Sequence, residues 1–445
     1  MTTRQVFDVL RKYESHNVTF IDPNGGWPIV WERAKGVHVW DADGKKYLDL
    51  TAAFGVAAAG HANPRVVKAG QKQMERLLHA MGDVHPHELK GRLARELSKL
   101  TFERWRQNES KVQSPKSKVE RRASEGKTIF CNSGFEAVEV ALKTAMLATK
   151  KRGVIAFEGA YHGLGYGALN ATYRQHFTRF FEKQLGGFGH FVPFPTEESK
   201  VASVETQIGL LLKKEEVGAI LVEPVQARGG IHVPPKQFLA MLRRVCDENG
   251  TLLILDEIYT GFGRTGKWFA CEHSRVLPDV ICVGKALTGG FPLSACVGRA
   301  DLMDAAWPVS SGEAIHTSTF LGHPVGCAMA LAQIEEIKRR RLVERSARLG
   351  RFLLSLLQSK ISNLKFEISV RGMGLLIGIE MRRHDGAPAT EEALGLIRSM
   401  LHAGFILLPE GEHSNVISLT PPLTITEAQL KASVSALKKA LSALE

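Results

Sequence analysis

Residues 251–290 decide the fold, and they read TLLILDEIYTGFGRTGKWFACEHSRVLPDVICVGKALTGG. The stretch contains two short apolar runs, TLLILD (251–256) and VICVG (280–284). Runs of this kind, rich in Val, Ile and Leu, are typical of strands that are buried on both faces of a sheet. Asp256 closes the first run and Lys285 follows the second. The stretch therefore predicts two buried strands with a charged group at the carboxyl end of each.

Four further runs of the same kind lie on both sides of this stretch, and they are KTIFC (127–131), GVIAF (153–157), GAILV (218–222) and SACVG (294–298). Helical patterns separate the runs, for example at 135–150 and 236–250, and Gly250 suits the end of the second helix. Because strands alternate with helices, we predict an α/β domain with a mostly parallel sheet at residues 60–315.

The two ends of the chain show a different pattern. Residues 28–50 predict a small β meander with turns at Lys35-Gly36 and Asp43-Gly44. The C-terminal part predicts a long helix from Pro324 toward the 350s, strands at 375–381, 405–409 and 416–419, and helices at 391–403 and 426–443. We therefore expect a smaller α+β domain at 316–445, with the N-terminal segment 1–59 packed on or near it.

Composition places the chain among globular proteins. Of its 445 residues 44% are hydrophobic and 23% are charged, which excludes wholesale disorder and fibrous classes. No apolar run approaches the ~18 residues that span a bilayer, and the polar start lacks a signal-peptide core, so we expect no membrane partner. Six Cys without a CxxC pair favour reduced thiols and a cytoplasmic setting. His85 and His87 have no third ligand placed beside them, and we predict no metal site.

The charge balance is basic, because 58 Lys and Arg face 46 Asp and Glu. A net charge of +12 permits nucleic acid as a partner, and it equally suits an enzyme that handles anionic cofactors and substrates. The basic stretches 103–127 and 338–351 predict solvated surface, with an arm for an acidic partner as the alternative. No aromatic residues interleave the charges of 338–351 as a nucleic-acid platform would need, and we expect no nucleic-acid partner.

One glycine-rich motif is misleading. GFGRTG (261–266) matches the pattern GxGxxG, and with Lys267 it nearly matches the phosphate loop GxxxxGK. Trp268 stands where a phosphate loop needs Ser or Thr, and the acidic pair Asp256-Glu257 separates the motif from its strand. We therefore assign no nucleotide site to it.

Asp256 and Lys285 together indicate one cofactor. A carboxylate at the end of an apolar strand is costly unless it meets a cation or a donor, although a helix cap or an ion pair would also satisfy it. A Lys flanked by glycines at the end of a buried strand can be desolvated, which lowers its pKa and frees the amine for Schiff-base chemistry. The alternative is an exposed loop Lys. Pyridoxal phosphate (PLP) needs both groups, a Lys for its aldehyde and a carboxylate for its pyridine nitrogen.

The phosphate of that cofactor needs a site as well. NSGFE (132–136) follows the strand at 127–131 and opens a helix, so it offers free backbone N–H groups and the positive end of the helix dipole. Ser133 and Glu136 also match the S-x-x-E capping box, and that structural role is compatible with binding an anion.

The chain resembles the class III aminotransferases, which are PLP enzymes of fold type I. The resemblance covers nearly the whole chain, and its motifs are 36–50, GHANPRV (60–66), NSGFEAVEVALK (132–143), YHG (161–163), EPVQARGG (223–230), LDEIYTGFGRTG (255–266), PDVICVGKALTGG (278–290), HTSTFLGHP (316–324), RGMGLLIGIE (371–380) and PPLTIT (421–426). It implies an α/β large domain with a mostly parallel seven-stranded sheet, a smaller α+β domain, and PLP as the cofactor.

The resemblance also implies roles for single residues. Lys285 matches the Schiff-base Lys, and Asp256 matches the acid that keeps the pyridine nitrogen protonated. The other cofactor-binding residues are Ser133, Gly134 and Phe135 at the phosphate, Tyr161 and Ile258 on the two ring faces, His162 beside Tyr161, and Thr319 from the neighbouring subunit. The substrate residues are Phe54, Glu223, Arg228 and Ser418, and Tyr161 and Glu223 join Lys285 and Asp256 in the catalytic set.

Four departures from the family pattern bear on the site. Phe135 stands where Thr or Ser is usual, and Tyr259 stands where many members have a Gln near the ring hydroxyl. HTSTFLGHP (316–324) replaces the common HGSTFGGNP. Ser418 falls where many members that use α-keto acids carry the Arg that grips the substrate carboxylate.

The expected function is transfer of an amino group from an amine donor to a keto acid, 2-oxoglutarate or pyruvate, through a Schiff base at Lys285. An epimerase, an aminomutase or a phospho-lyase of the same fold is the alternative, and a nucleic-acid-binding or regulatory protein is a remote one. Because Ser418 offers no guanidinium, we expect primary amines, diamines or ω-amino acids as donors. Arg228 or Arg174 would then hold the acceptor carboxylate. The match of Thr319 to a residue that acts in trans predicts a homodimer with shared sites.

Overall fold

The computed structural model describes residues 1–22, 27–109, 125–361 and 365–444. At its centre lies a seven-stranded sheet with strand order β4-β10-β9-β8-β7-β5-β6. The strands are β4 (Gly126–Cys131), β5 (Gly153–Phe157), β6 (Gly189–Val192), β7 (Val217–Val222), β8 (Leu252–Asp256), β9 (Val280–Val283) and β10 (Ser294–Arg299). β10 is antiparallel to both neighbours, and the other adjacent pairs are parallel. The expected mostly parallel seven-stranded sheet is therefore confirmed.

Six of these strands coincide with the predicted runs to within one residue. The edge strand β6 was not predicted, because it is short and only Val192 of its four residues is buried. A half-buried edge strand does not need the continuous apolar run that revealed the other six.

The sheet is buried on both faces, as the apolar runs predicted. In β8, Leu253 and Leu255 belong to one hydrophobic core together with residues of α10 (Gln237–Asn249). Ile254 points to the opposite face and joins a second core with α6 (Gly134–Thr149). This alternation follows from the two-residue period of a strand.

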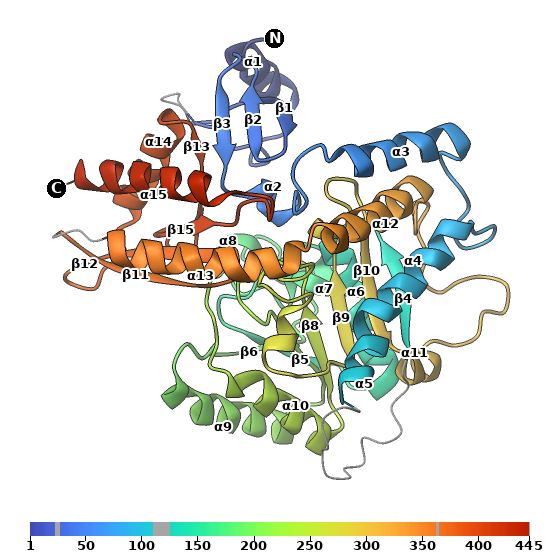
Figure 1. Cartoon of the computed structure of the whole chain (residues 1–445). Coiled ribbons are helices and arrows are strands. Elements are labelled where there is room, and N and C mark those ends of the chain that lie inside the picture. The colour runs from blue at the N-terminus through green and yellow to red at the C-terminus, as the bar shows by residue number, and fades with distance from the viewer. Residues whose placement is uncertain (23–26, 110–124, 362–364, 445) are drawn as a thin grey trace.

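Helices surround the sheet and connect its strands (Figure 1). The remaining helices of the N-terminal and large domains are α1 (Thr3–Tyr13), α2 (Ala52–Gly55), α3 (Pro64–Arg76), α4 (Glu88–Ser98), α5 (Arg104–Glu109), α7 (Tyr166–Leu169), α8 (Gln175–Thr178), α9 (Glu198–Lys214) and α11 (Ala300–Ala306). Short π and 3-10 turns occupy Lys99–Glu103, Glu182–Gln184, Ala270–His273 and Lys285–Leu287. Gly250 ends α10 with φ of 60°, so the predicted glycine cap is confirmed.

Two smaller sheets form the rest of the molecule. The first is antiparallel with order β11-β12-β15-β14, and its strands are β11 (Phe366–Met373), β12 (Leu376–Arg383), β14 (Leu408–Glu410) and β15 (Val416–Leu419). The second has order β1-β2-β3-β13 and consists of β1 (Trp31–Lys35), β2 (His38–Asp41), β3 (Lys46–Asp49) and β13 (Phe405–Ile406). Helices α14 (Thr390–His402) and α15 (Glu427–Ser442) pack against each other beside them.

The apolar run 405–409 was predicted as one strand, and this prediction is wrong. The run is divided at Leu407, because β13 pairs with β3 of the N-terminal meander while β14 pairs with β15. The division joins the two ends of the chain through β3 and β13. The domain boundaries after residues 59 and 315 stay predictions.

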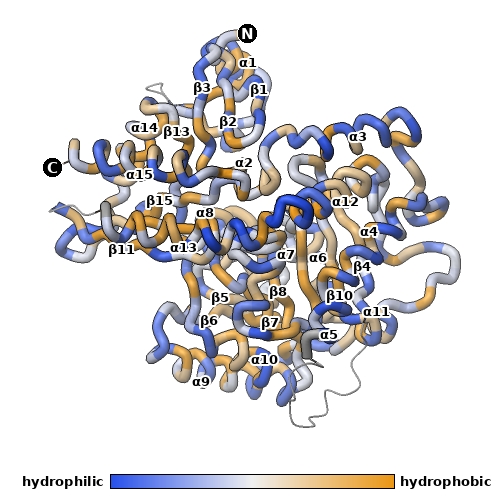
Figure 2. The backbone as a smooth tube through the Cα atoms, viewed as in Figure 1, coloured by the Kyte–Doolittle hydropathy of each residue, from blue (hydrophilic) through white to orange (hydrophobic). Residues whose placement is uncertain are grey.

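The long helical pattern after Pro324 forms two helices, α12 (Pro324–Arg339) and α13 (Leu342–Lys360). The break lies at Arg341, whose φ of 50° is left-handed and interrupts the right-handed helix. Figure 2 shows this basic junction as a hydrophilic segment, whereas the central strands are hydrophobic. In the basic stretch 338–351 six of the seven Lys and Arg residues are exposed, whereas Leu342, Ser346 and Leu349 are buried.

The glycine-rich motif 261–266 has a structural role. Arg264 is fully buried, and its Nη1 donates to the carbonyl oxygens of Leu375 at 2.9 Å and Pro421 at 2.6 Å. Gly266 has φ of 88°, and a Cβ there would lie 2.8 Å from Cα of Ala347, so glycine is required. The motif therefore holds the C-terminal segments against the large domain.

Most of the predicted solvated insertion at 103–127 lies outside the described residues. In the part of the chain that the structure describes, no helix is long and apolar enough to cross a membrane.

Candidate active site

The carboxyl ends of four neighbouring strands carry the predicted catalytic residues. Asp256 ends β8, Lys285 follows β9, Glu223 follows β7 and Tyr161 follows β5. These strands are adjacent and parallel, so their carboxyl ends lie at one edge of the sheet. This edge is where open α/β sheets bind ligands.

Asp256 is 5% exposed and is held by two donors. Its Oδ2 lies 2.8 Å from Nδ1 of His162, and its Oδ1 accepts from the backbone N–H of Ile258 at 3.1 Å. The other ring nitrogen of His162, Nε2, is buried and has no hydrogen-bond partner among the described residues. His162 thus orients the carboxylate and retains one unused polar atom beside it.

Lys285 has φ of 42°, a left-handed conformation that is rare for residues other than glycine. Burial lowers the pKa of Lys285, and the negative charges of Asp256, Glu223 and Glu410 act in the opposite direction. Its Nζ lies 4.4 Å from the centroid of the Tyr259 ring. A lowered pKa leaves more of the amine neutral at a given pH, and the neutral amine is the nucleophile for a carbonyl.

Glu223 is 5% exposed and uses both oxygens on backbone donors. Oε1 accepts from the N–H of Tyr161 and Oε2 from the N–H of Ala227, each at 3.1 Å. Burial raises the pKa of Glu223 to about 7, and the nearby charge of His162 is the largest opposing influence. Glu223 therefore holds a proton near neutral pH far more readily than an ordinary carboxyl does.

The start of α6 corrects one prediction. Ser133 is the N-cap residue, but its hydroxyl makes no cap bond to the helix, so the predicted capping box is wrong. Glu136 explains why, because its Oε2 accepts from the N–H of Asn132 at 2.9 Å and its Oε1 accepts from Oγ of Ser133 at 3.2 Å. The first-turn N–H groups are therefore not capped by Ser133, as an anion site requires.

Ile258 packs between this helix start and the strand that leads to the lysine. A Cβ added at Gly134 would lie 3.1 Å from Cδ1 of Ile258, and one at Gly284 would lie 3.5 Å from its Cγ2. Phe135 packs against Gly163, where no room is left for a Cβ. The glycines at 134, 163 and 284 thus leave the space that the side chains of Ile258 and Phe135 occupy.

A strained turn carries Phe54. Residues 52–54 have φ values of 48°, 50° and 60°, a left-handed conformation that costs on the order of 1 kcal/mol or more per residue. The turn packs against the 3-10 turn Lys285–Leu287. A Cβ at Gly55 would lie 3.1 Å from Cε1 of Tyr259. The half-exposed side chain of Phe54 thus belongs to a segment that abuts the lysine and its neighbour.

Two arginines occupy the side of the site near Tyr161. Arg228 lies 5.7 Å from the Tyr161 ring centroid, and its Nη1 donates to Oε2 of Glu410 at 3.0 Å. Arg174 donates from Nη2 to the backbone oxygen of Glu412 at 3.2 Å. Burial lowers the pKa of Arg174, and the nearby charge of Arg228 lowers it further. The two guanidinium groups are therefore close enough to repel each other.

Sequence reasoning missed Glu410. This residue ends β14 and is 2% exposed. Burial raises the pKa of Glu410 to about 7, whereas the charges of Arg228 and Lys285 lower it. The available signal was an acid at the end of the otherwise apolar run FILLPE (405–410), because such a residue is costly to bury without a reason.

Ser418 is buried in the small sheet. Its Oγ donates to the carbonyl oxygen of Leu408 at 3.1 Å, so its hydroxyl proton is used within the sheet. Ser418 therefore supplies no positive charge at the position where many family members carry the Arg that holds the substrate carboxylate. Its assignment to the substrate stays a prediction.

Thr319 is exposed in the loop that precedes α12. Its neighbour Ser318 accepts at Oγ from Nδ2 of Asn132 at 3.4 Å, and Thr317 donates to Oδ2 of Asp83 at 2.6 Å. The loop therefore lies beside the start of α6. Its action from a neighbouring subunit stays a prediction.

The residues present fit PLP. A buried acid is fixed beside the unused nitrogen of His162, a lysine has a lowered pKa, and a helix starts without a side-chain cap. These are the groups that a protonated ring nitrogen, an aldehyde and a phosphate require. By contrast, the described residues hold no group of three or more metal-ligating side chains.

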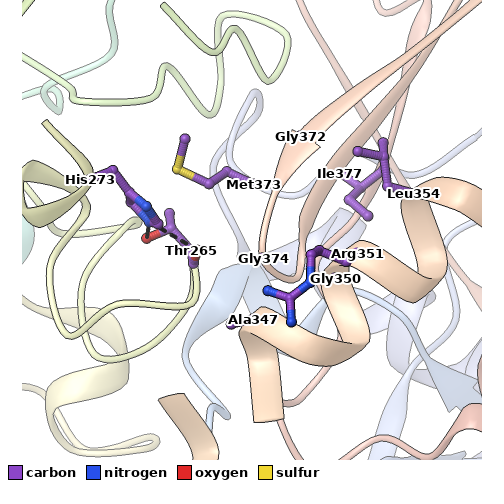
Figure 3. A pocket seen from close by; sticks show the side chains of 10 residues that line it. All are labelled: Thr265, His273, Ala347, Gly350, Arg351, Leu354, Gly372, Met373, Gly374 and Ile377. Carbon is purple, nitrogen blue, oxygen red and sulfur yellow. Dashed lines mark hydrogen bonds between the residues drawn. The ribbon is translucent and has the colours of Figure 1, made fainter. Parts of the chain in front are cut away.

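A separate pocket of about 220 Å³ lies between the glycine-rich loop and the small domain (Figure 3). Its lining includes Thr265, His273, Arg351 and Met373. Nε2 of His273 lies 3.2 Å from Oγ1 of Thr265, the bond drawn in Figure 3. None of the predicted site residues lines this pocket, so it is distinct from the cluster at the strand ends.

The fold carries a lysine and buried acids at one sheet edge, the arrangement that the sequence predicted for an enzyme working through a lysine amine, and comparison with known proteins identifies the family. The family profile described as Aminotransferase class-III matches residues 21–441. The chain belongs to the class III aminotransferase family, whose members are PLP-dependent.

Individual relatives agree with this assignment. The chain is 35% identical to an acetylornithine aminotransferase of Methanosarcina mazei over 94% of this chain and 92% of the relative. It is 37% identical to a putrescine aminotransferase of Pectobacterium atrosepticum over 94% and 84%. A structure of the ornithine aminotransferase from Toxoplasma gondii, described as having partial occupancy of PLP at its active site, matches with a TM-score of 0.82, 27% identity and coverage of 99% and 94%.

Proposed function

We propose that this aminotransferase binds PLP at Lys285 and moves an amino group from a primary amine, a diamine or an ω-amino acid to 2-oxoglutarate or pyruvate. The observation that carries the proposal is the junction of Lys285, Asp256 and the uncapped start of α6 at one sheet edge. The names of relatives that act on acetylornithine and putrescine support an amine that lies away from a free α-carboxylate.

Each residue then has a task. When bound, PLP supplies an aldehyde that reacts with amines and a protonated ring that withdraws electrons from the substrate carbon. Asp256, oriented by His162, would keep the ring nitrogen protonated. Ser133 and the N–H groups of Gly134 and Phe135 would hold the phosphate.

The ring faces and the reacting carbon involve other side chains. Tyr161 and Ile258 would cover the two faces of the ring and exclude water from them. Lys285, with its lowered pKa, would take the proton from the donor carbon and return it at the cofactor side. Glu223 would lie on the substrate side of the ring. Its raised pKa would let it take up or release a proton there as the charge of the bound substrate changes.

The acceptor needs a cation for its carboxylate. Arg228 and Arg174 lie on the same side of the site, and a guanidinium can hold a carboxylate with two parallel hydrogen bonds. We propose this pair for the acceptor. Phe54, on the strained turn, would contact the apolar part of the substrate.

We also propose a homodimer with shared active sites and a reducing, cytoplasmic setting. Exposed apolar side chains on two segments that contact each other, 78–84 and 315–320, support the dimer, because contiguous exposed apolar patches mark interaction sites. Six free and buried cysteines support the reducing setting.

The first test is chemical. The purified protein should lose its visible absorption band on borohydride reduction, which fixes the cofactor covalently to its lysine. Peptide mapping should find this covalent label on Lys285. Lys285→Ala should carry no label and have no transfer activity. A label on another lysine, or no bound cofactor, would contradict the proposal. Conversion of a donor without any net transfer to a keto acid would favour an epimerase, an aminomutase or a lyase.

The second test concerns the donor. With one fixed keto acid, kcat/KM should be higher for a terminal amine or an ω-amino acid than for alanine or glutamate. If an α-amino acid is better by about 10-fold, which corresponds to about 1.4 kcal/mol in transition-state binding, the argument from Ser418 is wrong.

A further inference from the structure

Glu410 is a buried acid with one oxygen that the protein leaves without a donor. Oε2 accepts from Nη1 of Arg228 at 3.0 Å, and the carboxylate side chain is 1% exposed. Oε1 is buried and has no hydrogen-bond partner within the described residues. An unsatisfied oxygen of a buried carboxylate is costly, so this atom calls for a donor from outside the chain.

The surroundings of Glu410 belong to the candidate active site. Its charge raises the pKa of Lys285, and its carboxyl in turn is influenced by Glu223 and Arg228. Burial raises the pKa of Tyr259, which lies under the lysine amine, to about 12, and the charge of Glu410 acts in the same direction. The hydrogen-bond partner of Glu410, Arg228, lies 5.7 Å from the Tyr161 ring centroid, so the acid lies on the Tyr161 side of the candidate site.

Strand register supports the same placement. Glu410 pairs with Val416, and Leu408 pairs with Ser418, so all four side chains lie on one face of the small sheet. This face meets Arg228, which follows β7 of the large domain. Glu410 is thus presented to the site from the small domain, opposite the strand ends.

We propose that Glu410 selects the amine donor by accepting, at Oε1, a hydrogen bond from a second cationic group, so that diamines are preferred. The inference rests on the proposed function and deepens it. Arg228 keeps Oε2 in place and fixes the direction of Oε1. A distal ammonium would gain an ion pair here, whereas the distal carboxylate of an ω-amino acid would meet a like charge, and a neutral chain would leave Oε1 unpaired.

Ionisation of Glu410 supports the idea. Burial raises its pKa to about 7, so part of the population is protonated near neutral pH. An arriving ammonium favours the ionised form and would expel that proton. Binding of a diamine at pH 7 should therefore release protons to the buffer.

The test compares donors of equal length with one fixed acceptor, namely 1,5-diaminopentane, 5-aminopentanoate and pentylamine. The variants are Glu410→Gln, which keeps the shape and removes the charge, and Glu391→Gln, which removes an exposed charge in the first turn of α14. In Glu410→Gln, kcat/KM for the diamine should fall by about 10-fold or more, as expected for a lost hydrogen bond to a charged group. The value for pentylamine should change by less than about 3-fold, that for 5-aminopentanoate should rise, and Glu391→Gln should keep the wild-type order.

A binding measurement separates this inference from turnover. Calorimetry with 1,5-diaminopentane on PLP-loaded Lys285→Ala should give a dissociation constant about 10-fold lower than on Lys285→Ala with Glu410→Gln. It should also give a larger proton release, because condensation of the reacting amine with PLP is common to both variants and only Glu410 adds a proton. Equal losses for all three donors, or equal dissociation constants, would overturn the role of Glu410. Failure of the wild-type protein to use any amine donor would instead overturn the proposed function.

Discussion

At the scale of single residues, three acids of the candidate site have different environments, and we propose a different task for each. Asp256 is held by a histidine ring and a backbone N–H. Glu223 is surrounded by backbone donors, and Glu410 pairs with an arginine through one oxygen. Burial raises the pKa of Glu223 and Glu410 to about 7. The same functional group can therefore hold a ring nitrogen, buffer charge or recognise a cation, according to its partners.

The first prediction concerns Asp256. Asp256→Asn keeps the shape but removes the negative charge that would pair with the ring nitrogen and His162. Loss of one partner of a buried charge pair costs about 3–5 kcal/mol, so kcat should fall by about 150- to 5,000-fold. Steady-state kinetics with saturating PLP would measure the loss, and Asp304→Asn, an exposed partner of Lys127, is the control. A kcat within about 3-fold of wild type would exclude the proposed role.

The second prediction concerns Lys285 and pH. Because burial lowers its pKa, attachment of PLP to the apoprotein should speed up as pH rises and level off below 10.5, the ordinary lysine value. The charge of Glu223 raises the pKa of Lys285, so Glu223→Gln should move the midpoint to still lower pH. Stopped-flow absorbance over a pH series would report both midpoints. A midpoint at or above 10.5 in the wild-type protein would contradict the effect of burial.

Not every site residue could be predicted from sequence. Lys285 and Asp256 could be placed together from the sequence because each lies at the carboxyl end of a buried strand, and strand ends in a parallel sheet meet at one edge; their roles stay predictions. Glu410 was missed because its contact with Arg228 joins two domains that are far apart in the sequence. The predicted capping box at Ser133 was wrong because Glu136 accepts instead from the N–H of Asn132 and from the hydroxyl of Ser133. The spacing of Ser133 and Glu136 in the sequence does not show which of these hydrogen bonds forms.

At the scale of secondary-structure elements, the start of α6 shows how packing and binding are linked. The helix follows β4, and Gly134 is its first residue. Ile258, from the segment after β8, fills the space beside it. Ile258 would cover one face of the PLP ring. The absence of a side chain at Gly134 lets Ile258 come close to the proposed phosphate site.

The third prediction follows from that contact. In Gly134→Ala the new Cβ would lie 3.1 Å from Ile258, which must move by a few tenths of an ångström. The free energy of unfolding should change by less than ~1 kcal/mol, because Gly134 has ordinary backbone angles and Ala favours a helix. The dissociation constant for PLP should rise by about 10-fold, since Ile258 shifts toward the ring. Urea denaturation and fluorescence titration measure the two quantities separately.

The matched control is Gly395→Ala in α14, where no atom lies within 4 Å of the added Cβ. It should stabilise the protein by up to ~1 kcal/mol and leave PLP affinity unchanged. Equal PLP affinities in the two variants would show that Ile258 does not respond to Gly134.

Elements differ in how well sequence predicts them. Strands buried on both faces were found almost to the residue, because burial requires continuous apolar runs. The edge strand β6 and the division of 405–410 into β13 and β14 were not predicted. They depend on the partner strands, which are β5 for β6, β3 for β13 and β15 for β14. The break between α12 and α13 at Arg341 was not predicted, because the sequence KRRRLV (338–343) contains no Gly or Pro to mark it.

At the scale of the whole molecule, two distant segments form one exposed apolar surface. Thr317 bonds to Asp83, and the rings of His79 and Phe320 lie 5.4 Å apart. Large exposed apolar side chains on these segments are Leu78, Met81, Val84, Ile315 and Phe320. Such a surface, beside the start of α6, suits contact with a second copy of the chain.

The last prediction tests whether Thr319 acts across that contact. Thr319→Ala should weaken PLP binding by about 10-fold or more, as expected when a charged phosphate loses one hydrogen bond. Lys285→Ala chains cannot link PLP but still carry Thr319. Heterodimers of the two variants, isolated through two different affinity tags, should therefore contain one site with both a lysine and a threonine from the partner. That site should regain wild-type PLP affinity and half of the wild-type activity per dimer. If Thr319 serves its own chain, the heterodimer keeps the weak affinity of Thr319→Ala, and a fully active monomer in sedimentation would contradict the shared site altogether.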